Sequence, residues 1–147
     1  MFYWMKKIFG TAQSRLLKRY RKMVDLVNRW EERMQKLSDE ELRAKTQQFR
    51  DRLQHGEDLD SLLPEAYAVV KNVCRRLMGK EVHVSGYTQK WDMIPYDVQI
   101  LGAIAMHQGA IAEMQTGEGK TLTAAMPLHR RWQSSDLVDI VLRNSEP

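Results

Sequence analysis

The sequence has few of the residues that build covalent or metal frameworks. It contains one cysteine, Cys74, so an internal disulfide framework is excluded and no cysteine pair has metal-ligand spacing. Cys74 stands in an apolar stretch, which predicts a small core residue in a reducing compartment. The four histidines, His55, His83, His107 and His129, are scattered along the chain. We therefore expect surface or structural roles for them rather than catalysis.

Long apolar runs are also absent. No stretch approaches the ~20 apolar residues that a membrane-spanning helix needs. The N-terminal segment 1–5 is short and its lysine pair follows the apolar part, which excludes a secretory signal but leaves contact with a membrane surface open. There is no repeat and no low-complexity linker. A chain of 147 residues with 43% hydrophobic residues suits one globular domain.

Positive charge is concentrated at the N-terminus. Residues 1–30 carry eight basic side chains and one acidic one, Asp25, whereas the whole chain has a net charge of only +4. Such a basic amphipathic helix can lie on anionic lipid or pack on another helix, and packing is the simpler interpretation. The aromatic segment 2–4 favours lipid contact. The apolar side chains that share one face at helical spacing are Leu16, Tyr20, Met23, Val24 and Val27.

Local signals predict the elements that follow. The segment Ser38–Glu41 is a capping box, so we expect a helix from there to about Leu53, ending near Gly56. Pro64 suits the first position of a second helix, which ends at Gly79. The expected buried stripe of that helix consists of Ala66, Val69, Val70, Val73 and Leu77.

Residues 80–92 do not follow the helical spacing of the preceding segment. Alternation within residues 80–92 predicts a short hairpin around Ser85-Gly86. A helix is expected over 97–107, with Gly109 at its C-terminal end. The apolar run 110–114 then predicts a strand.

The segment that follows this run has the pattern of a phosphate-binding loop. Its sequence is Thr116-Gly117-Glu118-Gly119-Lys120-Thr121. The two glycines let backbone N–H groups point at phosphate oxygens, Lys120 reaches the outer phosphates, and the Thr121 hydroxyl can ligate Mg²⁺. The strict pattern fails because Met114 stands where the first glycine is required. The remaining form is typical of helicase-like motor ATPases, and the alternative is a turn with a capping glycine pair and a surface lysine.

A second segment, upstream of the loop, has residues that suit contact with the adenine base of a nucleotide. A glutamine upstream of the loop can offer one donor and one acceptor to a base edge, and an aromatic residue can cover its face. We expect Gln99 to read adenine, Tyr96 to stack on it and Met93 to be a soft apolar neighbour. In isolation, a glutamine on a helix is usually only solvated.

Hydrolysis requires further groups. Carboxylates must hold Mg²⁺ and orient the attacking water, and an arginine usually neutralises the developing charge. After Pro127 the carboxylates are Asp136, Asp139 and Glu146, without an acidic doublet. The residues therefore predict a nucleotide-binding half-site, and we assign no catalytic residue.

Four motifs in register resemble one family. The segments 37–42, 63–68, 96–99 and 111–124 together look like the N-terminus of SecA, the preprotein translocase ATPase family of bacteria. The resemblance implies an α/β fragment, in which a mostly α-helical N-terminal region leads into the first strand, P-loop and helix of a RecA-like, helicase-type motor domain. It covers the chain from near Ile8 to about Pro127.

The resemblance also implies cofactors and partners. The family uses ATP and Mg²⁺ to push preproteins through the SecYEG channel, contacts acidic phospholipids and commonly dimerises. It works in the cytoplasm, peripherally at the inner face of the cell membrane. By position, Gln99 and residues 117–121 fall on its ATP-contacting positions, with Tyr96 and Met93 beside the adenine.

Three regions are expected. These are a basic amphipathic helix (1–30), a partial nucleotide-binding domain (31–127) and a tail (128–147) that resembles nothing in the family, as in a truncated or frame-shifted product without a Walker B doublet. The first hypothesis is a SecA-type fragment that keeps part of the ATP site and the membrane-facing N-terminus, with little or no turnover of its own. The alternative is a non-enzymatic helical module that binds a membrane or a partner and carries a vestigial P-loop. Nucleic-acid binding ranks last, because no recognition motif accompanies the basic segment.

Overall fold

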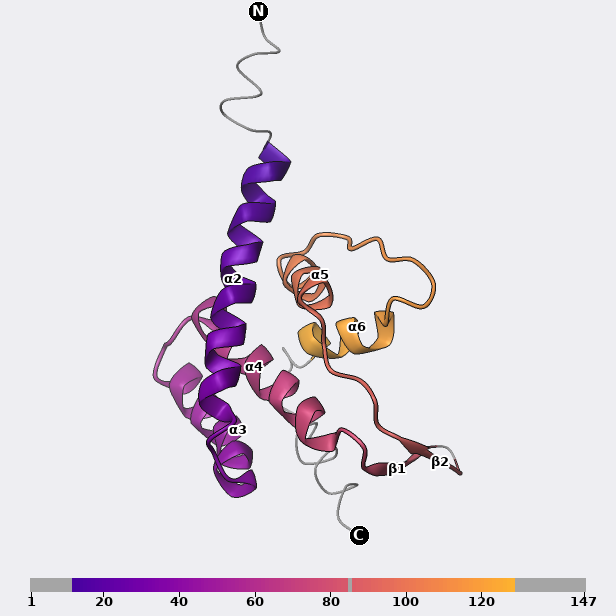
Figure 1. The fold of residues 1–147 in the computed structure, drawn as a ribbon. Helices are drawn as coiled ribbons and strands as arrows, with labels where there is room; N and C mark the ends of the chain where they lie inside the picture. The colour runs from indigo at the N-terminus through magenta and orange to yellow at the C-terminus, as the bar shows by residue number, and fades with distance from the viewer. Residues whose placement is uncertain (1–11, 85, 129–147) are drawn as a thin grey trace, which may run out of the picture.

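The computed structural model describes residues 12–84 and 86–128, which form a mostly helical structure with one two-stranded sheet (Figure 1). The elements are α2 (Ala12–Met34), α3 (Asp39–Gln54), α4 (Leu59–Leu77), β1 (Glu81–Val84), β2 (Tyr87–Lys90), α5 (Asp97–His107) and α6 (Lys120–Leu128). Within the described residues, no helix combines the length and apolar composition that a membrane crossing requires.

Helix α2 is amphipathic and packs along α4, with further contacts to α5 (Figure 1). Its apolar face is buried through Tyr20, Val24 and Val27, which confirms the expected helical spacing. Leu16 was expected on the same face but is 42% exposed, because α4 does not reach the first turns of α2. The aromatic segment 2–4 lies outside the described residues. The packed face shows that helix–helix docking accounts for most of the amphipathic pattern.

Helix α3 begins where the sequence predicts. The N–H of Glu41 donates to Ser38 Oγ at 3.2 Å, and the N–H of Ser38 donates to Glu41 Oε2 at 2.7 Å, so the capping box is complete. Beyond the helix, Gly56 has a φ of +87°, a left-handed conformation that favours glycine. Leu42 and Phe49 are buried against the core. The local signals therefore fixed both ends of this helix.

Helix α4 is the central helix, but it begins earlier than expected. Asp58 is its N-cap and accepts the N–H of Asp60 at 3.1 Å, so the first helical residue is Leu59. The prediction of Pro64 at the first position is wrong, because the Asp58 cap starts the helix upstream and leaves the proline inside it. The predicted stripe is confirmed, since Ala66, Val69, Val70, Val73 and Leu77 are all buried.

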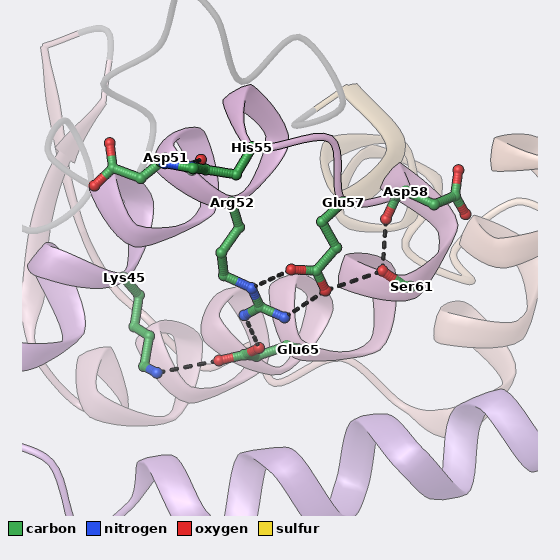
Figure 2. Close-up of polar contacts among 8 residues, drawn as sticks. All are labelled: Lys45, Asp51, Arg52, His55, Glu57, Asp58, Ser61 and Glu65. Carbon is green, nitrogen blue, oxygen red and sulfur yellow. Dashed lines mark hydrogen bonds and ion pairs between the residues drawn. The ribbon is translucent and has the colours of Figure 1, made fainter.

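A buried carboxylate joins α3 to α4 (Figure 2). The Glu65 side chain is 4% exposed and lies 3.1 Å from Lys45 Nζ and 2.6 Å from Arg52 Nη1. Arg52 also contacts the Glu57 carboxylate at 2.7 Å, and this hydrogen bond lowers the pKa of Glu57. Because a buried charge is costly unless it is paired, these two cations are what allow Glu65 to sit in the interior.

A second buried carboxylate joins α2 to α4. Glu31 accepts hydrogen bonds from Arg75 Nε at 2.8 Å and Asn72 Nδ2 at 3.1 Å. Burial alone would raise the pKa of Glu31, but the hydrogen bonds from Arg75, Gln35 and Asn72 outweigh it, so the pKa is lowered. Each of the two helix pairs around α4 thus contains one buried carboxylate that is paired with basic side chains.

The cysteine and histidines take the structural roles expected of them. Cys74 is buried in the core, and burial raises the pKa of its thiol to about 12. His107 is buried and its Nε2 lies 2.8 Å from Asp60 Oδ1. His55 and His83 are exposed, and His129 lies outside the described residues.

The predicted hairpin is confirmed. Strands β1 and β2 pair antiparallel, with Val84 opposite Tyr87, and Gly86 in the turn has a φ of +83°. The N–H of Trp91 also donates to the carbonyl of Lys80 at 2.9 Å, which continues the ladder beyond the strands. The hairpin extends away from the helices (Figure 1).

The strand expected at 110–114 does not form. In the described residues the only sheet is the β1–β2 hairpin, so this run has no neighbouring strand with which to pair. It is an irregular segment between α5 and α6, and Ile111 within it is 96% exposed. A strand of a parallel sheet is defined by its neighbours, so the apolar run alone is not sufficient to make one.

Candidate nucleotide-binding site

The two predicted motifs meet at one side chain. Gln99, in the first turns of α5, is 6% exposed. Its Oε1 accepts the N–H of Tyr96 at 2.9 Å, and its Nε2 donates to the carbonyl of Glu118 at 2.8 Å. The upstream segment and the glycine-rich loop are therefore in direct contact, although 19 positions separate the two residues.

The environment of Gln99 also fixes which end of its amide is the carbonyl. An amide group has two N–H donors and two acceptor lone pairs. Tyr96 and Glu118 each use one of these, so one lone pair and one N–H remain. A donor and an acceptor in that arrangement suit the edge of an adenine base.

Both loop glycines adopt conformations that favour glycine. Gly117 has a φ of +92° and Gly119 a φ of +76°. A Cβ on Gly119 would lie 2.3 Å from Gln99 Nε2, whereas one on Gly117 would meet nothing within 4 Å. Two features therefore require a glycine at position 119, namely its positive φ and the close approach of Gln99.

The charged side chains of the loop are turned onto its own backbone. Lys120 Nζ donates to the carbonyl of Gln115 at 2.8 Å, and the Glu118 carboxylate accepts the N–H of Gln115 at 2.7 Å. The Lys120 partner is a neutral carbonyl, and a charged phosphate oxygen would bind the ammonium more strongly. The lysine is therefore held beside the loop in a position from which it can exchange partners.

Helix α6 begins at Lys120, as the loop pattern predicts. The first backbone N–H groups of a helix lack intrahelical partners and favour an anion. Thr121, the predicted Mg²⁺ ligand, is exposed at this end of the helix. In residues 12–84 and 86–128 no group of three or more histidine, cysteine or acidic side chains could hold a metal ion.

Sequence reasoning missed Thr123. It is fully buried, and its Oγ1 donates to the carbonyl of Gly119 at 3.1 Å, which braces the loop from the following turn. Its methyl group would lie 3.4 Å from a Cβ on Gly102 of α5. Gly102 was the available signal, because a glycine inside an apolar helical pattern indicates that a neighbouring segment approaches closely.

A cleft of about 520 Å³ lies beside this contact. Four predicted site residues line it, namely Tyr96, Gln99, Gly117 and Glu118. Its wall from α2, which no local motif could have indicated, consists of Gln13, Leu17 and Tyr20.

The other predicted residues are not part of the cleft lining. Gly119 follows Glu118 in the loop, and Lys120 and Thr121 are the first two residues of α6. Tyr96 is 72% exposed, as a stacking surface requires. Met93 is 44% exposed and lies apart from the lining, and its carbonyl accepts the Trp91 Nε1–H at 2.6 Å. The structure therefore brings Gln99, Tyr96 and the loop together, and it leaves Met93 outside.

These features define a class of protein, and comparison with known families identifies it. A glycine-rich loop that opens a helix and contacts an upstream glutamine is the arrangement expected of a DEAD-like motor domain. The family described as the SecA DEAD-like domain matches residues 5–145, so the chain belongs to that family.

Individual relatives agree with the family match. The chain is 60% identical over 144 residues to the protein translocase subunit SecA of Chlamydia pneumoniae, which covers 98% of this chain and 15% of the relative. The same identity and coverage hold for the protein translocase subunits SecA of Chlamydia caviae and Chlamydia abortus. The chain thus spans about 15% of the length of these relatives.

The comparisons correct one expectation. The match to the family runs to residue 145, so it includes most of the segment 128–147. We expected that segment to be a tail unrelated to the family, and that expectation is wrong. The resemblance based on short motifs ended at about Pro127, because the residues beyond it contain no such motif. A comparison over the whole chain does not depend on short motifs.

Proposed function

We propose that this chain is the ATP-binding portion of a SecA-type motor, which couples ATP hydrolysis to preprotein transport through the SecYEG channel. The observation that supports the proposal is the contact between Gln99 and the Glu118 carbonyl, because it joins the glutamine proposed to read the base to the loop proposed to bind phosphate. Membership of the SecA DEAD-like domain family supports the proposal. The relatives support it too, since they are protein translocase subunits.

Each site residue has a distinct part in this proposal. Gly117, Glu118 and Gly119 direct backbone groups at the phosphates, and Lys120 exchanges the Gln115 carbonyl for a phosphate oxygen. The start of α6 adds its free N–H groups. Thr121 ligates the Mg²⁺ that accompanies ATP.

The base is held by the upstream segment. Gln99 uses its remaining lone pair and N–H and Tyr96 covers the ring, whereas Met93, which lies outside the cleft lining, takes no part in this proposal. Hydrolysis needs carboxylates for Mg²⁺ and water and an arginine for the developing charge, and we assign no catalytic residue to the described part of the chain. We expect weak or absent turnover and measurable binding.

The Lys120→Ala variant tests the proposal. Because a charge-assisted hydrogen bond contributes about 1.5–3 kcal/mol, the variant should bind a fluorescent ATP analogue roughly 10- to 100-fold more weakly. Equilibrium titration followed by fluorescence anisotropy measures this. Lys36→Ala, which removes an exposed lysine of the α2–α3 connection, is the matched control and should bind as the wild type does. Identical affinities of the wild type and Lys120→Ala would refute nucleotide binding by this loop.

A second candidate function is that of a helical membrane- or partner-binding module with a vestigial P-loop. The solvent face of α2 favours it, because Arg15, Lys18, Arg19 and Lys22 are exposed there. Leu26 on the same helix is 43% exposed. Basic side chains with an accessible apolar residue suit an acidic phospholipid surface. In this proposal the chain lies peripherally at the cytoplasmic face of the membrane, with SecYEG and a second copy of the chain as further partners.

Sedimentation with vesicles distinguishes the two functions. We expect binding to anionic vesicles at about 0.05 M salt and its loss at about 0.5 M, because salt screens exposed charges. The Arg19→Glu/Lys22→Glu variant should lose binding, and Lys120→Ala should retain it. Lipid binding without any nucleotide binding would favour the helical module. Salt-insensitive binding, or equal binding to uncharged vesicles, would contradict the electrostatic surface.

A further inference from the structure

Three polar side chains from three helices meet at the start of α5. Asn28 of α2 donates through Nδ2 to Asp97 Oδ1 at 3.1 Å. Lys71 of α4 donates through Nζ to Asn28 Oδ1 at 2.7 Å, and the same Nζ lies 3.4 Å from Asp97 Oδ1. This Asn28–Lys71–Asp97 cluster is closed, because each member contacts the other two.

The burial of the cluster is uneven. The Lys71 side chain is 11% exposed and that of Asp97 is 65% exposed. Lys71 needs its partners because a buried ammonium is costly, whereas Asp97 could be solvated by water alone. The cluster therefore satisfies the buried Lys71 ammonium, and it also ties the exposed Asp97 carboxylate to α2 and α4.

Asp97 is the residue whose position matters for the cleft. It is the first residue of α5 and directly follows Tyr96, whose N–H fixes the carbonyl end of the Gln99 amide. A shift of Asp97 moves that N–H with it. Helix α2 also lines the cleft through Leu17 and Tyr20, so it both forms one wall and anchors the opposite segment.

We propose that Asn28 and Lys71 are positioning residues for the base-reading segment 96–99, and that they act through Asp97. This inference rests on the proposed nucleotide site. Adenine and guanine present opposite donors and acceptors on comparable edges, and an amide that turns over by 180° can serve either base. Discrimination therefore depends on the orientation of Gln99, which the Tyr96 N–H and the Glu118 carbonyl maintain together, and the cluster holds the start of α5 beside Tyr96.

The test compares base selectivity in lysine variants of the full chain. Competition of Mg·ATP and Mg·GTP against a fluorescent ATP analogue gives the preference for ATP. In Lys71→Met this preference should fall roughly three- to tenfold, the value of one neutral hydrogen bond. Lys71→Arg keeps the cation and should restore the preference. Lys45→Met is the matched control, since it also removes a lysine from an ion pair, with Glu65, and should lower thermal stability without changing selectivity.

The outcomes are separable. A wild type that binds no nucleotide defeats the proposed function itself. A wild type that binds ATP and GTP equally, or a Lys71→Met variant with undiminished preference for ATP, overturns the positioning role and leaves the proposed function standing. Should Lys71→Met not fold, Asn28→Ala removes a half-buried neutral member of the same cluster and must show the same loss of selectivity.

Discussion

Replacing Gly119 with alanine is expected to weaken nucleotide binding on the order of 100-fold. The added Cβ would lie 2.3 Å from Gln99 Nε2, so the amide must move and its bond to the Glu118 carbonyl is lost. The φ of +76° at this position also opposes any side chain, by about 1–2 kcal/mol. Both effects act where the base-reading group meets the phosphate loop. Titration with a fluorescent ATP analogue measures the loss.

Gly56→Ala is the control for the cost of placing an alanine at a positive φ. Gly56 has a similar φ of +87°, and a Cβ there would meet nothing within 4 Å. This variant should lose about 1 kcal/mol of stability and keep its nucleotide affinity. If Gly119→Ala bound nucleotide as tightly as Gly56→Ala, the contact between Gln99 and the loop would have no part in binding.

Phe49→Ala is expected to have the largest effect on stability, with a loss of about 3–5 kcal/mol. Phe49 is 1% exposed. It lines a small pocket of about 20 Å³ together with Tyr67 of α4 and Met126 of α6, so its removal enlarges that pocket at the junction of three helices. Against a total of about 5–15 kcal/mol for an ordinary domain, this is a large fraction of the free energy of unfolding.

Urea denaturation followed by circular dichroism measures this change. Tyr87→Ala in the hairpin is the control, because Tyr87 is 71% exposed and its removal should change stability by less than about 0.5 kcal/mol. A loss of less than about 1 kcal/mol in Phe49→Ala would contradict the packing of α3 onto the core.

The sequence predicted those parts of the fold that depend on local chemistry. The capping box at Ser38 set the start of α3, and Gly86 marked the turn of the hairpin. Pro64 was a misleading start signal, because the Asp58 cap, which was not predicted, begins α4 upstream of it. The run 110–114 is different, because a strand depends on neighbours that a local pattern does not contain.

The same division applies to the site. The loop and the upstream glutamine are short motifs, and their sequence order alone indicated that they act together. The contribution of α2 was not predictable, since Leu17 and Tyr20 reach the cleft only through the packing of α2 against α4 and α5. Asn28 and Lys71 lie 69 and 26 positions from Asp97, so no local spacing relates them.

Calorimetric titration of the intact, folded chain with Mg·ATP and Mg·ADP tests the central claim most directly. Folding is established first by a cooperative thermal transition. Binding of one nucleotide per chain, with heat that disappears in Lys120→Ala, is the result that we predict. A folded wild type that gives no heat at millimolar nucleotide would contradict the claim that residues 115–121 form a phosphate-binding loop.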